Sequence, residues 1–248
     1  MESSAFLIIR RLDEIMFWNE DRIKWYLLAS EYTGYHDNMA LEIKKVVPKG
    51  ESLFDFGCGL GLLPIKLSDH FSDIVGVDYD EHVLELLEKR ISKNKINNFK
   101  TILSDCYNRE IIEKIGKKDN ILLSHFGNIE DYFYNFYDLF SKRMIIIRND
   151  VENEIVHNSN KNTIQDICKF LDDRKVPYKI YRQTFEFGQP LKDGKEVMKY
   201  LEKWYGERGI NLVSNVKDIN YNYNGEIFTK YYCKPKNTAI VIVEKEDI

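Results

Sequence analysis

The sequence has no paired-cysteine motif and no long apolar run. Its four cysteines are scattered without a CxxC pair, so neither a zinc site nor a disulfide framework is indicated. No stretch reaches the roughly 20 apolar residues that span a bilayer. The short run AFLII near the N-terminus is followed at once by charged residues and has no cleavage site. We therefore expect a soluble protein of the reducing cytoplasm, without a signal peptide or a membrane partner.

The chain also lacks a strong excess of charge of either sign. Its 36 basic and 40 acidic residues leave a formal net charge of -4, which provides no basic field for nucleic acid. A small molecule is therefore the expected partner, and no nucleic acid is expected. His36 and Asp37 are too few for a metal site, so no metal is predicted. No motif indicates an oligomeric state.

From residue 51 onward, short apolar runs alternate with longer segments of helical period. This alternation is typical of a parallel sheet covered by helices and predicts an α/β fold. The predicted strands cover residues 52–57, 73–78, 100–105, 120–126, 144–150, 176–188 and 239–245. The predicted helices between them cover residues 62–70, 81–94, 108–116, 129–140 and 162–174. The first four strands each end in a polar or glycine-containing stretch, where open α/β sheets bind ligands.

Two segments lie outside this predicted core. Residues 12–45 carry aromatic side chains among charged ones and predict amphipathic helices ahead of the first strand. Residues 190–230 contain another predicted helix, 194–209, between two late strands. The simplest organisation is a single domain, 1–248, with an N-terminal helical cap (1–48), a core (49–187) and a lid-like helical insertion (about 188–230).

The stretch LFDFGCGLGLLP, residues 53–64, places three glycines at alternate positions between a predicted strand and a predicted helix. Gly57, Gly59 and Gly61 allow a tight turn that brings backbone N–H groups against a ligand, and their missing side chains leave room for it. Asp78 ends the next strand, about 20 residues beyond Gly57, where a carboxylate accepts hydrogen bonds from both ribose hydroxyls. This order of elements predicts a nucleoside-containing cofactor.

The pattern resembles the class I S-adenosylmethionine-dependent methyltransferases over roughly residues 50–150. The resemblance rests on DFGCGLG at 55–61, on Asp78 closing the second strand, and on Ser104, Asp105 and Cys106 closing the third. It implies a Rossmann-like, seven-stranded, mostly parallel sheet in the order 3-2-1-4-5-7-6 with helices on both faces. In that order, residues 178–188 and 238–245 are strands six and seven. It also implies S-adenosyl-L-methionine as cofactor and S-adenosyl-L-homocysteine as product.

In that family the glycine loop lies beneath the methionine part of the cofactor. The acid after the second strand holds the ribose, and the acid after the third strand accepts a hydrogen bond from the adenine amino group. The resemblance thus assigns cofactor contacts to Asp55, Gly57, Cys58, Gly59, Gly61, Asp78, Tyr79, Asp105, Cys106 and Ser124. Among these residues, the backbone of Cys106 faces the adenine and the ring of Tyr79 lies against it.

An NAD(P)-dependent oxidoreductase is the nearest alternative, because it shares the strand, the glycine loop and the acid. Its GxGxxG motif places the third glycine where helix and strand pack closely, whereas this chain has GxGxG followed by Leu62, Leu63 and Pro64. The spacing favours the methyltransferase. A non-catalytic S-adenosylmethionine-binding protein of the same fold is a further alternative.

The fourth predicted strand ends in LSHFGN, residues 123–128, which should face the methyl group. His125 is the candidate catalytic residue, because a neutral imidazole accepts a proton from a hydroxyl or amine. Alternatively, His125 caps the following helix or bonds to backbone. The chain lacks the NPPY-type motif that resembles enzymes methylating amino groups of nucleic acids or glutamine. We therefore predict methyl transfer to an oxygen, nitrogen or carbon nucleophile of a small molecule.

Aromatic residues on the flanking segments are the remaining candidates. Tyr32 and Tyr35 lie where the N-terminal helices of similar methyltransferases cover the cofactor, so they are candidate contacts to it. Alternatively, they form the apolar stripe of a packed helix. The helix at 194–209, with Tyr200 and Trp204, either covers the substrate end of the sheet as a lid or packs as a peripheral helix.

Overall fold

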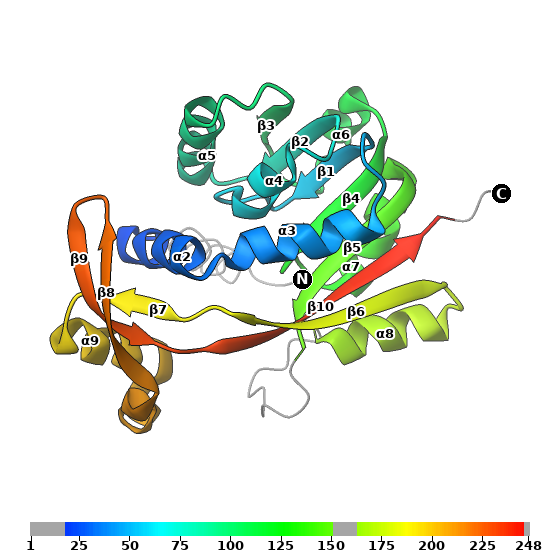
Figure 1. The fold of residues 1–248 in the computed structure, drawn as a ribbon. Helices are drawn as coiled ribbons and strands as arrows, with labels where there is room; N and C mark the ends of the chain where they lie inside the picture. The colour runs from blue at the N-terminus through cyan, green and yellow to red at the C-terminus, as the bar shows by residue number, and fades with distance from the viewer. Residues whose placement is uncertain (1–17, 151–162, 246–248) are drawn as a thin grey trace, which may run out of the picture. The chain divides into compact units, whose positions relative to one another are not determined.

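The computed structural model describes residues 18–150 and 163–245, which divide into two compact units. The larger unit comprises residues 36–184 and 237–245, and the smaller unit comprises residues 18–35 and 185–236. Figure 1 shows the elements of both units. Within the described ranges, no helix has the length and apolar character needed to cross a membrane.

A seven-stranded sheet forms the centre of the larger unit, in the order β3-β2-β1-β4-β5-β10-β6. The strands are β1 (Ser52–Phe56), β2 (Asp73–Asp78), β3 (Phe99–Leu103), β4 (Lys118–Ser124), β5 (Phe140–Asn149), β6 (Tyr178–Glu186) and β10 (Pro235–Glu244). The first five pair in parallel, and β10 runs antiparallel to β5. This topology confirms the predicted fold, with β6 and β10 as its sixth and seventh strands.

Helices cover both faces of this sheet, because its central strands are apolar on both sides. On one face, alternate strand residues such as Phe56, Leu123 and Ile146 pack against α6 (Arg109–Ile115), α7 (Ile129–Phe136) and α8 (Ile164–Asp173). The opposite face is covered by α3 (Tyr35–Val46), α4 (Leu62–Leu67) and α5 (Glu81–Lys93) (Figure 1).

Local sequence signals set several of these helix ends. Asp80 caps α5 by accepting hydrogen bonds from two backbone N–H groups of its first turn. Thr163 and Asp166 form a reciprocal capping box at the start of α8. The predicted helix at 129–140 is shorter in the structure: α7 is followed by the 3-10 turn η1 (Tyr137–Leu139), and β5 then begins at Phe140. The apolar pattern predicted this strand only from residue 144, because its first residues include the charged Lys142 and Arg143.

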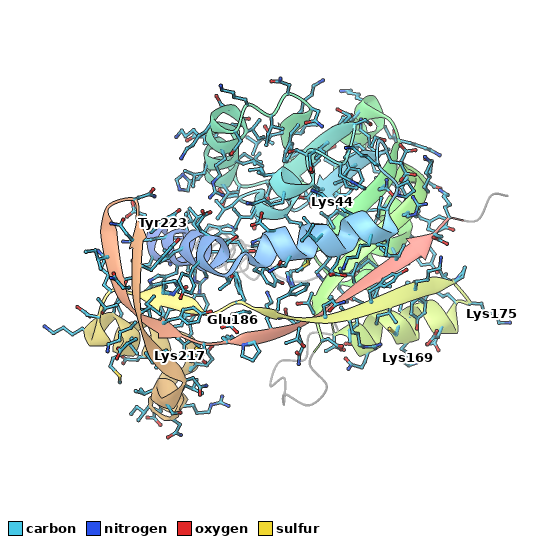
Figure 2. All side chains as sticks on the ribbon, in the orientation of Figure 1. Lys44, Lys169, Lys175, Glu186, Lys217 and Tyr223 are labelled. Carbon is cyan, nitrogen blue, oxygen red and sulfur yellow. The ribbon has the colours of Figure 1, made fainter. Side chains whose placement is uncertain are left out.

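The smaller unit contains an antiparallel sheet in the order β7-β9-β8, with α2, α9 and the 3-10 helix η2. Their bounds are α2 (Glu20–Thr33), β7 (Gln189–Leu191), α9 (Gly194–Tyr205), η2 (Gly206–Asn215), β8 (Val216–Tyr223) and β9 (Glu226–Tyr232). The segment in which we predicted only a helix therefore also contains a hairpin. Asn224 and Gly225, with φ of 52° and 84°, form its turn beside Tyr223 (Figure 2). An Asn-Gly pair between strand-forming residues is a local hairpin signal that the sequence analysis overlooked.

A buried carboxylate joins three strands at the amino edge of the larger sheet. Glu51 directly precedes β1 and accepts a hydrogen bond from Asn120 Nδ2 on β4 at 2.8 Å. From β5 it accepts bonds from Lys142 at 3.1 Å and from Arg143 at 2.7 Å. Burial alone would raise the pKa of Glu51, but the bonds from these three donors outweigh burial and lower the pKa.

Replacing this carboxylate, as in Glu51→Gln, should destabilise the fold by about 1–3 kcal/mol at pH 7, because two cations lose their charged acceptor. The pKa of Glu51 is lower in the folded than in the unfolded state. Its contribution is therefore present above the unfolded pKa of about 4.3 and is lost as pH falls through the folded pKa. Urea unfolding at several pH values from 7 down to about 3 should show the two proteins converging. A constant difference in unfolding free energy would contradict this account.

Candidate functional site

The residues that the sequence analysis assigned to cofactor and catalysis in the larger unit lie at or beside the carboxyl edge of its sheet. Strands β1 to β4 are parallel and end at this edge. The glycine loop follows β1, Asp78 is the last residue of β2, and Asp105 and His125 follow β3 and β4. The topology therefore brings together residues that are separated by up to 70 positions in the sequence.

The glycine loop adopts a conformation that side chains other than glycine tolerate poorly. Gly57, Gly59 and Gly61 have φ of 70°, 49° and 63°. A Cβ atom on Gly57 would lie 2.6 Å from the ring of Phe126, and one on Gly61 would lie 2.2 Å from Leu87 on α5. The protein's own packing therefore already requires two of the three glycines.

Several backbone N–H groups of the loop bond inside the protein, contrary to our expectation that they face a ligand. The amides of Gly57 and Cys58 donate to the carbonyl oxygen of Val77 at 2.8 and 3.2 Å. The amide of Gly59 donates to Oδ2 of Asp78 at 2.7 Å. Gly57 is exposed, so its backbone stays accessible to a ligand, but the ring of Phe126 occupies the place that a side chain on Gly57 would take.

Asp78 connects the glycine loop to β2. Its side chain is buried, and its second oxygen, Oδ1, accepts from the amide of Asp80 at 3.0 Å. Burial raises its pKa, although the bonds from Asp80 and Gly59 act in the opposite direction. A carboxylate has about four lone-pair positions. The backbone of Tyr79 is a third hydrogen-bond donor to this carboxylate, so one acceptor direction is left for a ligand hydroxyl.

Three further predicted residues lie beneath the loop, with their side chains buried. Burial, and then the charge of Asp78, raises the pKa of Asp55 well above its usual range. Burial likewise raises the pKa of the thiols of Cys58 and Cys106. The sulfur of Cys106 points at the carbonyl oxygen of Val77, 3.7 Å away. These cysteines thus act as small apolar side chains that support the loop.

Three of the residues after β2 and β3 are open to solvent: Tyr79, Asp105 and Tyr107. Asp105 is exposed, and its Oδ1 accepts from the amide of Tyr107 at 2.9 Å. Tyr79 and Tyr107 are 54% and 41% exposed, unusual for large rings. Burial of part of the Tyr107 ring, followed by the charge of Asp131, raises its pKa to about 12, so its hydroxyl stays protonated at neutral pH.

The turn after β4 carries His125 in a strained conformation. His125 is exposed, with φ of 54°, and its amide donates to the carbonyl oxygen of Ile147 on β5 at 3.0 Å. Ser124, the last residue of β4, is partly buried. The side chain of Asn128 caps α7 by accepting from the amide of Glu130 at 3.3 Å. The alternative that His125 caps this helix is therefore wrong, whereas its backbone does form a hydrogen bond.

Arg148, which we did not single out from the sequence, donates hydrogen bonds to the backbone of the turn after β4. Its guanidinium is buried at the end of β5 and donates through Nη2 to the carbonyl oxygens of Phe126 and Gly127, the latter at 2.7 Å. Burial lowers the pKa of Arg148. The available signal was an arginine directly after the apolar run MIII, because a charged side chain at the end of a buried strand needs internal acceptors.

A group of rings supports the same turn. The Phe126 ring lies 6.2 Å from Tyr107 and 5.8 Å from Phe136 between ring centroids, and Phe136 also stacks on Phe56 of β1 at 4.5 Å. The hydroxyl of Tyr132 is buried beneath them and has no hydrogen-bond partner within residues 18–150 and 163–245. The turn after β4, the loop after β3 and the glycine loop are thus packed as one body.

The two tyrosines predicted to contact the cofactor belong to the smaller unit. The ring of Tyr32 lies 4.8 Å from Tyr221 and 4.7 Å from Tyr231, between centroids. Tyr35 packs against Phe187 at 4.5 Å. Their role in cofactor binding stays a prediction. In the ranges that the structure describes, no group of three or more His, Cys, Asp or Glu side chains is placed to hold a metal ion.

Comparison with solved structures supports the same fold. The YcgJ protein of Bacillus subtilis aligns with a TM-score of 0.56 at 11% identity, covering 87% of this chain and 100% of that protein. A structure titled as a putative methyltransferase of Bacillus halodurans aligns with a TM-score of 0.54 at 12% identity, covering 85% and 99%. At these identities the likeness concerns the fold alone.

Sequence comparison identifies the family. The ribosomal protein L11 methyltransferase of Thermotoga petrophila is 33% identical to this chain over 69 residues. The match covers 26% of this chain and 26% of that protein, so the chain spans only about a quarter of the length of this relative. A family model for the TRM5/TYW2 methyltransferase domain matches residues 32–176, more than half of the chain. This segment contains β1 to β5 and α8, and with them the glycine loop, Asp78, Asp105 and His125. The chain therefore belongs to the TRM5/TYW2 methyltransferase domain family, and with it to the class I S-adenosylmethionine-dependent methyltransferases.

Proposed function

We propose that the protein transfers the methyl group of S-adenosylmethionine to an oxygen, nitrogen or carbon atom of a small molecule. One observation carries the proposal: a glycine loop with positive φ is held by the buried carboxylate of Asp78 at the carboxyl edge of the sheet. Family membership supports the cofactor and the reaction class. It argues against the NAD(P)-dependent oxidoreductase considered above.

The residues at this edge fit the cofactor. The remaining acceptor direction of Asp78 suits a ribose hydroxyl, and the exposed carboxylate of Asp105 suits the adenine amino group. The exposed ring of Tyr79 offers a face on which the adenine can stack. Gly57 is exposed and adds no side chain of its own beside the methionine part, although the ring of Phe126 lies on its Cβ side.

Bound S-adenosylmethionine supplies an already reactive sulfonium methyl, so the protein mainly aligns the acceptor and excludes water. A base is needed only where the acceptor atom holds its proton at neutral pH. His125 is exposed on the turn after β4 and is our candidate for that role. Arg148 and the hydrogen bond from the backbone N–H of His125 to the carbonyl oxygen of Ile147 fix the backbone that carries the imidazole.

A small-molecule acceptor is supported by the net charge of -4 and by the absence of an NPPY-type motif. The lid-like role of residues 188–230 and a cytoplasmic location stay predictions. The acceptor class can be tested by incubating the protein with methyl-labelled S-adenosylmethionine and three separated fractions: small metabolites, total RNA and ribosomal proteins. Label in the small-molecule fraction is expected. Label only in RNA or protein would contradict the acceptor class, and label in none would favour a non-catalytic binding protein.

Asp78→Ala should weaken S-adenosylhomocysteine binding by roughly tenfold to a hundredfold, because ribose hydroxyls lose a charged acceptor worth about 1.5–3 kcal/mol. Asp119→Ala is the matched control. Asp119 also accepts a backbone N–H, from Ser52 at 2.9 Å, but at the amino edge of the sheet. Calorimetry on both folded variants should show weaker binding for Asp78→Ala alone. Equal affinities would remove Asp78 from the site.

His125→Ala should lower kcat by about a hundredfold or more while S-adenosylhomocysteine affinity barely changes, because general-base catalysis contributes this much without holding the cofactor. The control is His82→Ala, an exposed histidine in the first turn of α5. Turnover is measured with the acceptor found in the labelled fraction. Wild-type turnover in His125→Ala would assign this residue a purely structural role.

Arg148→Met should release the turn after β4 and speed amide hydrogen exchange of residues 125–128 by at least about tenfold, because two carbonyl oxygens lose a charged donor. Arg148→Lys should restore part of the protection. Arg143→Met serves as control, since Arg143 lies on the same strand but bonds to Glu51 at the opposite edge. Exchange mass spectrometry showing the same protection in both methionine variants would rule out this role for Arg148.

A further inference from the structure

In the smaller unit, one lysine faces aromatic rings instead of carboxylates. Lys236 stands near the start of β10, and its Nζ lies 4.8 Å from the ring centroid of Tyr35 and 4.9 Å from that of Phe187. Within the described residues, its ammonium takes part in no ion pair and no hydrogen bond. By contrast, the neighbouring Lys234 donates to the hydroxyl of Tyr205 at 2.8 Å.

The two rings beneath Lys236 belong to a larger aromatic cluster. Tyr35 and Phe187 lie 4.5 Å apart, between centroids, and Phe185 approaches Tyr35 at 5.5 Å. Tyr26 extends the cluster from Phe187 at 5.6 Å, and Trp18 follows at 5.4 Å from Tyr26. Tyr35 and Phe185 are buried, whereas Trp18, Tyr26 and Phe187 keep part of their surface accessible. The cluster therefore offers apolar contact surface next to the ammonium.

The ammonium of Lys236 is largely desolvated, so it lacks most of the hydrogen bonds that water would form with it. Cation–π attraction to two rings replaces part of its hydration, but its three N–H donors have no acceptor among the residues that the structure describes. Burying a charge without a partner is unfavourable. Accordingly, desolvation, and then the positive charge of Lys234, lowers the pKa of Lys236 to about 8. A bound anion would supply the missing acceptors.

We propose that Lys236 and the aromatic cluster form a binding site for a small organic carboxylate. The carboxylate pairs with the ammonium, and its apolar body lies against the accessible faces of the rings. A mostly apolar site with a single polar anchor is the usual composition of small-molecule sites in proteins. The proposal goes beyond methyl transfer and does not depend on it.

The carboxylates near Lys236 are engaged with other partners. Glu186 at the end of β6, labelled in Figure 2, accepts from the hydroxyl of Tyr231 at 2.6 Å and from the amide of Lys234 at 2.9 Å. Two carboxylates on the adjoining helices pair with other cations: Asp21 of α2 with Lys199 at 3.0 Å, and Asp37 of α3 with Lys66 at 2.7 Å. Among the residues that the structure describes, Lys234 is the neighbour whose charge lowers the pKa of Lys236.

The site should bind an organic carboxylate more weakly as pH rises. The charged form of Lys236 binds the carboxylate, so affinity is highest below the pKa of about 8 and falls above it. Above that pKa the loss is about tenfold per pH unit, until the higher pKa of the complex is reached. A site that used only the rings would show no such dependence.

Benzoate is a suitable probe, and the full chain is the protein to use. Calorimetry at pH 6.5 should detect benzoate binding that weakens at pH 9. NMR of lysine labelled at Cε should show the pKa of Lys236 rising when benzoate is added. Lys236→Met should bind benzoate at least tenfold more weakly, whereas Lys234→Met, which removes the neighbouring ammonium, should bind at least as well as wild type.

Three results would overturn the proposal. These are a Lys236 titration that benzoate leaves unchanged, wild-type affinity in Lys236→Met, and inorganic phosphate binding as tightly as benzoate. The last result would show an anion site without a contribution from the rings. If Lys236→Met does not fold, the NMR titration of the wild-type protein decides alone. None of these measurements uses methyl transfer, so failure here and failure of the proposed function are distinguishable.

Discussion

The hydrogen bond from the amide of Gly59 to the carboxylate of Asp78 is the contact on which the proposed site depends. It joins the loop after β1 to the end of β2 at 2.7 Å, and it lies in a buried environment where such a charge-assisted bond is strong. The same carboxylate is our candidate for the ribose hydroxyls. One side chain would therefore set the shape of the loop and bind the cofactor, so the two tasks cannot be separated by mutating it alone.

Packing around the loop explains why small residues occupy it. The ring of Phe126 fills the space that a Cβ on Gly57 would need, and Leu87 does the same at Gly61. Phe126 in turn belongs to the turn that Arg148 holds through backbone carbonyls. The glycine loop and the acceptor-facing turn after β4 thus constrain each other directly. A change in either is expected to reach the other through side-chain contact.

The two ends of β5 illustrate two uses of a partly buried arginine. Arg143 at the amino edge donates to Glu51 and ties three strands together, which serves stability. Arg148 at the carboxyl edge donates to backbone carbonyls and shapes a turn. In each case the surrounding low dielectric makes the partner obligatory. The position along the strand decides whether that partner is part of the scaffold or part of the candidate site.

The sequence by itself determined the α/β class, the strand order and the loop between β1 and α4, because these depend on local periodicity, on glycine and on a family pattern within about a hundred residues. It also contained the Asn224–Gly225 turn signal of the hairpin, which we overlooked. Only the tertiary structure decided that the loop amides bond internally, that Arg148 lies beneath Phe126, and that Lys236 faces rings. These contacts join segments far apart in the chain, and no local pattern specifies which distant group will satisfy a buried donor or acceptor.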